Sequence, residues 1–117
     1  MSESPIDQTA LDNLIASTDK EFVKDLIDTF LEDAPRLLAD MRQALKDNDP
    51  DAFRRAAHSL KSNAASFGAL SLSAQAKELE QLAKTGTLDG ARGRLEQLAA
   101  AYEPVQHALK AWQHDAN

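Results

Sequence analysis

Apolar residues recur at intervals of three and four along almost the whole chain. An α-helix turns by about 100° per residue, so positions at this spacing share one face of a helix. The pattern covers residues 6–15, 22–45, 53–67, 72–83 and 88–112. No stretch shows sustained alternation of β-branched and aromatic residues with period two, so the pattern predicts helices and no sheet.

Capping residues indicate where the predicted helices begin and end. Asp49 offers a side-chain oxygen to free backbone N–H groups, and Pro50 has the backbone angle of a first helical residue. Gly68 can adopt the left-handed conformation that ends a helix. We also expect Thr18 or Asp19 to cap the second helix, Ser71 or Ser73 to start the fourth, and Thr85–Gly86 to end it.

Two prolines fall inside apolar patterns. Pro35 lacks the N–H that a helix interior needs, so it predicts a kink or a break within residues 22–45. We favour a break, with Asp33 capping the second segment, because proline is well tolerated in a first helical turn. Pro104 predicts a kink in the last helix, which has the longest apolar seam of the chain.

Four main amphipathic helices joined by short turns predict an all-α fold. The arrangement that buries their apolar faces is an antiparallel up-down four-helix bundle, with an additional short N-terminal helix or helices packed on it. A chain of 117 residues, 43% of them hydrophobic, is of the size of one domain with one core. We therefore expect a single domain over residues 1–117, with residues 1–5 and 115–117 as frayed tails.

The composition argues against several classes of function. A formal charge of −6 does not suit a nucleic-acid or anionic-membrane surface, which needs a basic footprint. Without cysteine there is no disulfide, thiol nucleophile or cysteine-type zinc site. No segment approaches the ~20 apolar residues of a membrane span, and the N-terminus lacks a secretory signal. We expect a cytoplasmic protein, and Met1 with its polar tail favours a free-standing one over a fragment of a larger kinase.

The predicted helix over residues 53–67 presents a histidine on its polar face. That face carries Asp51, Arg54, Arg55, His58, Lys61, Ser62 and Ala65. Lys61 lies one turn after His58, where its ammonium can approach an anion held on the imidazole. Ser62 and Ala65 are small and leave the ring accessible. A lone histidine on such a face is ordinarily a solvated side chain, and these neighbours are what make His58 a candidate site.

The stretch Ala57-His58-Ser59-Leu60-Lys61-Ser62, with a glycine ten residues after the histidine, resembles a known motif. It is similar to the histidine-containing phosphotransfer (HPt) domain, whose pattern is His, any residue, Leu, Lys, Gly and a later glycine. The segments 30–35, 67–69 and 79–80 also look like the family, so the resemblance covers most of the chain. Ser62 replaces the glycine after the lysine, and as the next smallest polar residue it should preserve function.

The resemblance implies that His58 is a phosphoacceptor. It would take a phosphoryl group from an aspartyl phosphate on one receiver domain and pass it to another. Its partners would be response-regulator receiver domains and a sensor histidine kinase, hybrid kinases included. The aspartate, the Mg²⁺ ion and a further cation should belong to the receiver, and this chain should bind no cofactor or metal. The sequence has no P-loop or kinase glycine-rich loop, so we expect neither ATP binding nor self-phosphorylation.

The other candidate site residues follow from the same helix and the same resemblance. Lys61 would stabilise phosphoryl charge, and Asp51, Arg54, Arg55, Ser62 and Ala65 would contact the partner. Ser62 is a possible phosphoryl hydrogen-bond donor, with a plain exposed helix residue as the equal alternative. By the resemblance, Glu80 falls where the family often places a polar residue that orients the ring. Here we favour the alternative, an exposed and solvated glutamate.

Two other classes of function compete with this hypothesis. The first is a helical docking or adaptor module that uses the same face without phosphorylation. The second is a metal or cofactor bundle, which needs ligands that project inward, where this pattern is apolar. Glu103, His107 and His114 share a face of the last helix and are expected to be solvated. We expect a monomer, since the exposed face is already assigned to partners.

Overall fold

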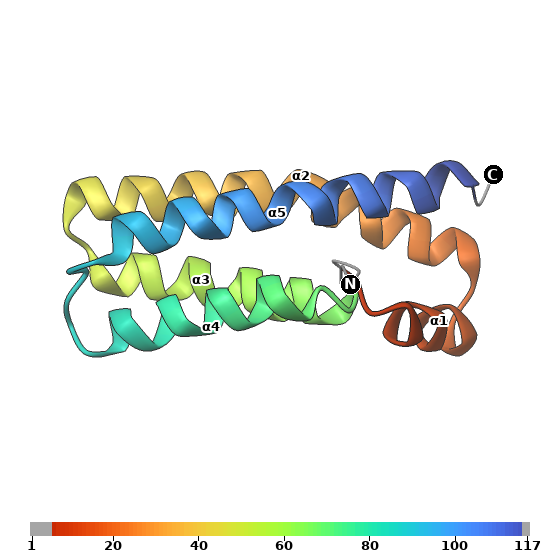
Figure 1. Cartoon of the computed structure of the whole chain (residues 1–117), viewed down its shortest axis with the longest axis horizontal. Coiled ribbons are helices and arrows are strands. Elements are labelled where there is room, and N and C mark those ends of the chain that lie inside the picture. The colour runs from red at the N-terminus through yellow and green to blue at the C-terminus, as the bar shows by residue number, and fades with distance from the viewer. Residues whose placement is uncertain (1–5, 116–117) are drawn as a thin grey trace, which may run out of the picture.

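The computed structural model describes residues 6–115, which form five helices and no strand (Figure 1). They are α1 (Gln8–Ser17), α2 (Lys20–Asp47), α3 (Pro50–Ser66), α4 (Leu70–Lys84) and α5 (Ala91–Asp115). Each helix from α2 to α5 runs antiparallel to the next one and packs on it, and α5 closes the ring on α2. The predicted all-α up-down bundle is confirmed. The predicted tails lie outside the described residues, except Asp115, which ends α5.

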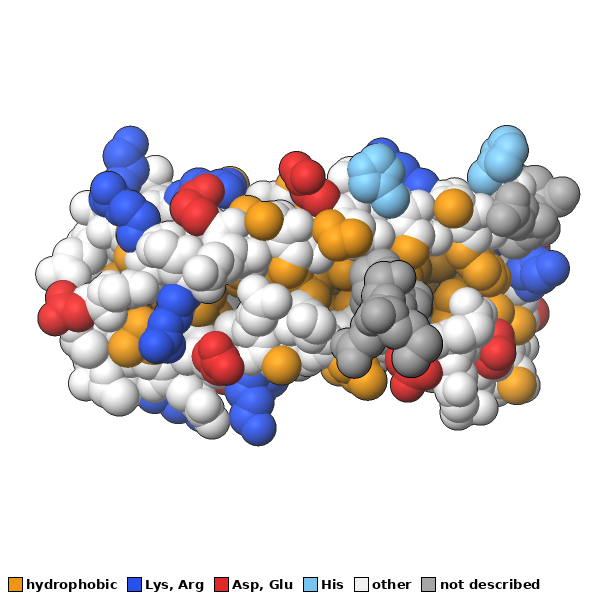
Figure 2. Space-filling model, viewed as in Figure 1, with side chains coloured by type: hydrophobic (Ala, Val, Ile, Leu, Met, Phe, Trp, Pro, Cys, Tyr) orange, Lys and Arg blue, Asp and Glu red, His pale blue; other side chains and the backbone are white. Residues whose placement is uncertain are grey.

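One apolar core runs the length of the bundle. Its largest fully buried side chains include Ile27, Met41, Phe53, Leu60, Leu79, Leu98 and Leu109. Figure 2 shows apolar side chains along the seam between α4 and α5, beneath a surface that is mostly polar and charged. None of the described helices combines the length and the apolar character that a bilayer-spanning helix needs.

Helix α2 continues through Pro35, so the predicted break is wrong. Ala34, Leu37 and Leu38 are buried on both sides of the proline, which itself is exposed. Burial contributes about 1.5–3 kcal/mol per large apolar side chain, which together outweighs the roughly 3 kcal/mol cost of an interior proline. Asp33 therefore caps nothing, and its Oδ1 accepts a 3.2 Å hydrogen bond from Arg36.

The predicted caps at Asp19 and Asp49 are confirmed. Their side chains accept hydrogen bonds from the backbone N–H groups of Phe22 (2.8 Å) and Ala52 (3.1 Å). The predicted serine start of α4 is wrong, because the helix begins at Leu70 without a side-chain cap. The last helix also begins later than its apolar pattern, which starts at residue 88, because Gly90 has a φ of 79° and lies outside it.

Gly68 joins the end of α3 to the start of α1. It has a φ of 74°, a conformation that an L side chain rarely adopts. Its carbonyl oxygen accepts a 2.7 Å hydrogen bond from the backbone N–H of Asp7, the residue that caps α1. A Cβ atom at Gly68 would lie 2.7 Å from the Asp7 carbonyl oxygen. This glycine therefore both ends α3 and lets α1 approach the bundle end.

Candidate functional site

His58 projects from the outer face of α3, near the middle of the helix. Ala57 and Leu60 on either side of it are buried in the core, and this packing turns the histidine outward. Its side chain retains 56% of its accessible surface. A partner can therefore reach the imidazole ring without any opening of the bundle.

Glu80 on α4 lies beneath the ring and bridges two residues of α3. Its Oε2 is 2.6 Å from His58 Nδ1, and its Oε1 accepts a 2.7 Å hydrogen bond from Lys61 Nζ. The glutamate side chain is only 4% exposed. The expectation of an exposed, solvated glutamate is wrong, because α4 packs tightly on α3 and turns this carboxylate into the interface.

The electrostatic balance keeps Glu80 ionised. The hydrogen bond from Lys61 is the main cause that lowers the pKa of the carboxyl, against a smaller opposing effect of burial, and His58 adds to the lowering. An ionised carboxylate can only accept hydrogen bonds, so Nδ1 must carry the proton that it shares with Glu80. In the neutral ring Nε2 is then the unprotonated nitrogen. The geometry thus selects one tautomer of His58.

A second contact holds the two site helices in register. The Ser73 hydroxyl of α4 donates a 2.9 Å hydrogen bond to the Lys61 carbonyl oxygen of α3. Ser73 precedes Glu80 by two helical turns, so both side chains face α3. The sequence-based prediction, in which Ser71 or Ser73 starts the helix, does not include this positioning role. The spacing of Ser73 from Glu80 was a usable signal, although only the packing of α4 on α3 gives that face its neighbour.

The residues predicted to contact a partner lie along the outer side of α3. Asp51 accepts a 3.0 Å hydrogen bond from Arg54 and forms a 3.4 Å ion pair with Arg55. The Arg54 hydrogen bond and then the Arg55 charge lower the pKa of Asp51. Beyond His58, Ser62 and Ala65 are exposed. The structure brings all these side chains to one face, and their contact with a partner stays a prediction.

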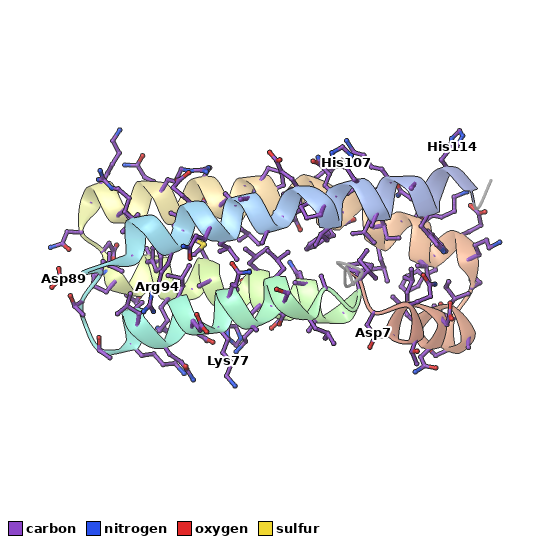
Figure 3. The ribbon with its side chains drawn as sticks, in the orientation of Figure 1. Asp7, Lys77, Asp89, Arg94, His107 and His114 are labelled. Carbon is purple, nitrogen blue, oxygen red and sulfur yellow. The ribbon has the colours of Figure 1, made fainter. Side chains whose placement is uncertain are left out.

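The other two histidines lie elsewhere on the molecule. His107 and His114 project from α5 away from the bundle, and both are exposed, as is Glu103 (Figure 3). Helix α5 packs on α2 and α4 and lies diagonally across from α3. Within residues 6–115, no three side chains of the metal-binding types are grouped to hold an ion.

Comparison with known proteins places this geometry in a family. The model of the Hpt domain matches residues 25–108, which include both site helices. The chain belongs to the Hpt domain family. The Hpt fold is also that of a solved structure, histidine-containing phosphotransfer protein B (HptB) from Pseudomonas aeruginosa PAO1. The two chains are 31% identical and superpose with a TM-score of 0.90, over 97% of this chain and 98% of that one. No curated protein sequence gives a significant match.

Membership in the Hpt family defines the general role of the chain. It is a phosphotransfer protein of two-component phosphorelays, where Hpt domains interact with receiver domains and kinases. Such proteins carry phosphoryl groups and are not kinases. The family resemblance inferred from the His58 motif is therefore confirmed.

Proposed function

We propose that His58 accepts a phosphoryl group from the aspartyl phosphate of one receiver domain and passes it to the aspartate of another. The observation that carries the proposal is the contact between His58 Nδ1 and the buried, ionised Glu80. It leaves Nε2, on an exposed ring, as the nucleophile. Family membership supports the phosphorelay role, and the site geometry supports this residue and this nitrogen.

From this chain the transfer uses only the His58 ring and the two residues that support it, Glu80 and Lys61. The Nε2 lone pair attacks phosphorus, the bond between phosphorus and the aspartyl oxygen breaks, and the aspartate leaves as a carboxylate. The new N–P bond puts positive charge on the ring while Nδ1 keeps its proton. Glu80 offsets that charge at 2.6 Å. In the reverse step an aspartate oxygen attacks phosphorus and the electron pair returns to Nε2.

Lys61 serves both Glu80 and the phosphoryl group in this mechanism. An ammonium has three N–H donors, and the hydrogen bond to Glu80 uses one of them. The others are available to phosphoryl oxygens on the adjacent ring, since the lysine side chain is 26% exposed. The positive charge of Lys61 also compensates Glu80, so the carboxylate does not repel an incoming phosphoryl group.

The receiver supplies the rest of the reaction centre. Phosphoryl transfer depends on in-line positioning and charge neutralisation, which a receiver provides through its aspartate, its cationic side chain and Mg²⁺. Arg54 and Arg55 add positive charge near His58, which suits an acidic receiver site. Ser62 and Ala65 are small and allow close approach. We propose this patch, with Asp51, as the receiver contact.

A labelling experiment tests the proposal. The chain is incubated with a phosphorylated receiver domain and Mg²⁺, and the label is tested for acid lability and alkali stability. We expect label on the parent and on His107→Gln, which removes another exposed histidine, and none on His58→Gln. Label on His58→Gln would overturn the assignment. A parent that binds receivers but takes no label would favour the docking-module alternative.

A further inference from the structure

An open cavity lies between α2 and α3, directly beside the proposed phosphoryl site. It encloses about 370 Å³, and its floor is formed by small or aliphatic side chains such as Leu37 and Ala56. Ser59, the residue after His58, lines its near end. Arg55, one turn before His58 on the same helix, also lines the cavity, so a receiver that covers His58 also reaches it.

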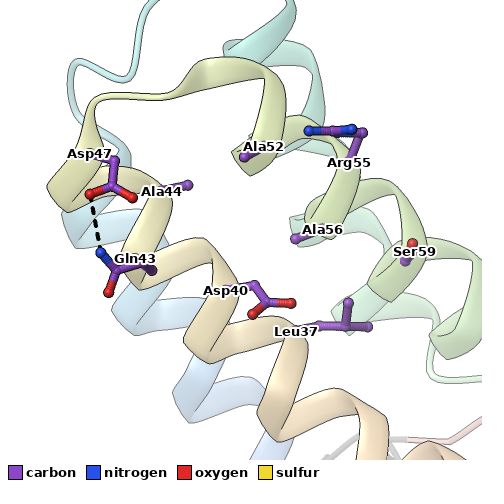
Figure 4. A pocket seen from close by; sticks show the side chains of 9 residues that line it. All are labelled: Leu37, Asp40, Gln43, Ala44, Asp47, Ala52, Arg55, Ala56 and Ser59. Carbon is purple, nitrogen blue, oxygen red and sulfur yellow. Dashed lines mark hydrogen bonds between the residues drawn. The ribbon is translucent and has the colours of Figure 1, made fainter.

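The cavity is acidic on the α2 side. Figure 4 shows Asp40 on α2 pointing towards α3, where Arg55 and Ser59 line the cavity, while Asp47 is turned to Gln43 on its own helix. Asp47 accepts a 3.1 Å hydrogen bond from Gln43. The Asp40 side chain is exposed and makes no hydrogen bond or ion pair with any described residue. Within residues 6–115 neither carboxylate has a counter-charge, because the only partner of Asp47 is the neutral Gln43 amide, and Asp40 is the one whose oxygens also lack any hydrogen bond.

The cation in the lining does not neutralise these carboxylates. The Arg55 guanidinium pairs with Asp51, on its own helix and outside the cavity, at 3.4 Å. A second hollow of the same α2–α3 face, beside Asn63 and Ser66, has a mainly apolar lining, and its carboxylate Asp33 is paired with Arg36. Of these two hollows, only the one that contains Asp40 offers an uncompensated charge.

We propose that the receiver domain inserts a lysine or arginine side chain into this cavity, with its aliphatic stem on the apolar floor and its charge at Asp40. Such a side chain matches both the apolar floor and the acidic rim. The inference rests on the proposed function, since the occupant belongs to the receiver that docks on His58. Asp40 then determines which receivers bind and how fast they associate.

Charge reversal at Asp40 tests the docking inference. Asp40→Lys is compared with Glu103→Lys, which makes the same change in net charge on exposed α5. Each variant is first labelled with phosphoramidate, a small donor that needs no docking, and we expect parent-like labelling of His58. Transfer from a phosphorylated receiver that labels the parent is then measured. We expect Asp40→Lys to slow it by about tenfold or more and Glu103→Lys to leave it unchanged.

Salt and a compensating substitution sharpen the result. The defect of Asp40→Lys should shrink between about 0.1 M and about 1 M salt, as the screening length falls from about 10 Å to about 3 Å. Reversal of one basic residue on the receiver should restore transfer to Asp40→Lys. Equal rates for Asp40→Lys and Glu103→Lys would overturn the docking inference and leave His58 as the acceptor. Failure of both donors to label His58 would overturn the proposed function itself.

Discussion

Glu80 Oε2 lies 2.6 Å from His58 Nδ1, although the two residues are 22 positions apart and belong to different helices. The histidine is exposed and the glutamate is buried, so the contact joins the reactive surface to the interior of the bundle. It fixes the ring orientation and the tautomer together. The behaviour of His58 therefore depends on the packing of α4 against α3.

Glu80→Gln should slow phosphoryl transfer by about tenfold, and by up to about 100-fold if the ring also shifts. The amide oxygen can still accept from Nδ1–H, but the charge that balances the phosphorylated ring is lost. Transfer rates from one receiver measure the effect, and NMR of the ring nitrogens reports the tautomer. Glu78→Gln, an exposed position on the same helix, is the matched control. Equal rates for the two variants would show that Glu80 has no role in transfer.

Lys61→Ala should destabilise the fold as well as slow transfer. It leaves Glu80 buried with only His58 as a partner, which we expect to cost about 1–3 kcal/mol. Urea unfolding measures this loss. The double variant Lys61→Met with Glu80→Leu removes both charges, so it should recover stability without recovering transfer. If Lys61→Ala matches the parent in both stability and transfer, the bridging role of Lys61 is wrong.

The Glu80 pairing should make stability depend on acidity. The pKa of Glu80 is lowered in the folded state, whereas in the unfolded chain it returns to the ordinary glutamate value of about 4.5. As the pH falls, Glu80 takes up a proton in the unfolded chain before it does so in the folded protein. The stability that Glu80 contributes is therefore complete at neutral pH and is lost as the pH approaches the folded-state pKa. We expect the stability difference between the parent and Glu80→Gln to shrink between neutral pH and about pH 3. A constant difference would contradict the linkage.

Gly68→Ala should cost more than Gly86→Ala, although both glycines have positive φ. A Cβ at Gly68 would meet the Asp7 carbonyl oxygen at 2.7 Å, whereas a Cβ at Gly86 would meet nothing within 4 Å. We expect about 1 kcal/mol for the shared backbone strain, and about 1–3 kcal/mol more at Gly68 for the displacement of α1. Urea unfolding of both variants gives the difference. Equal losses would mean that α1 does not depend on this close approach.

Tyr102→Phe should leave the fold as stable as the parent, or stabilise it by about 1 kcal/mol. The Tyr102 ring packs edge-on against Phe30, its buried hydroxyl has no hydrogen-bond partner among the described residues, and burial raises its pKa. Thermal unfolding measures the change. Tyr102→Leu, which removes the ring as well, should be clearly destabilising. A marked loss in Tyr102→Phe would show that the hydroxyl makes a stabilising contact.

The sequence by itself determined the features that depend on neighbours in the chain. Asp49 and Pro50 start α3 through local capping, and the helical period places His58 and Lys61 on one outer face. These are short-range properties, so apolar spacing and a motif were enough to predict the bundle and the exposed histidine. The Pro35 break failed for the opposite reason, because burial of apolar side chains on both sides outweighed a local backbone preference.

Only the tertiary structure decided what surrounds His58. The sequence alone predicts that Glu80 is a solvated charge. The close packing of α4 on α3 buries its carboxylate and brings it to His58 Nδ1. The same packing gives the Ser73 hydroxyl its partner, the Lys61 carbonyl oxygen. The packing of α2 on α3 forms the cavity that Asp40 lines. Contacts between residues distant in the chain depend on how whole helices pack, and helical periodicity defines the faces but not their neighbours.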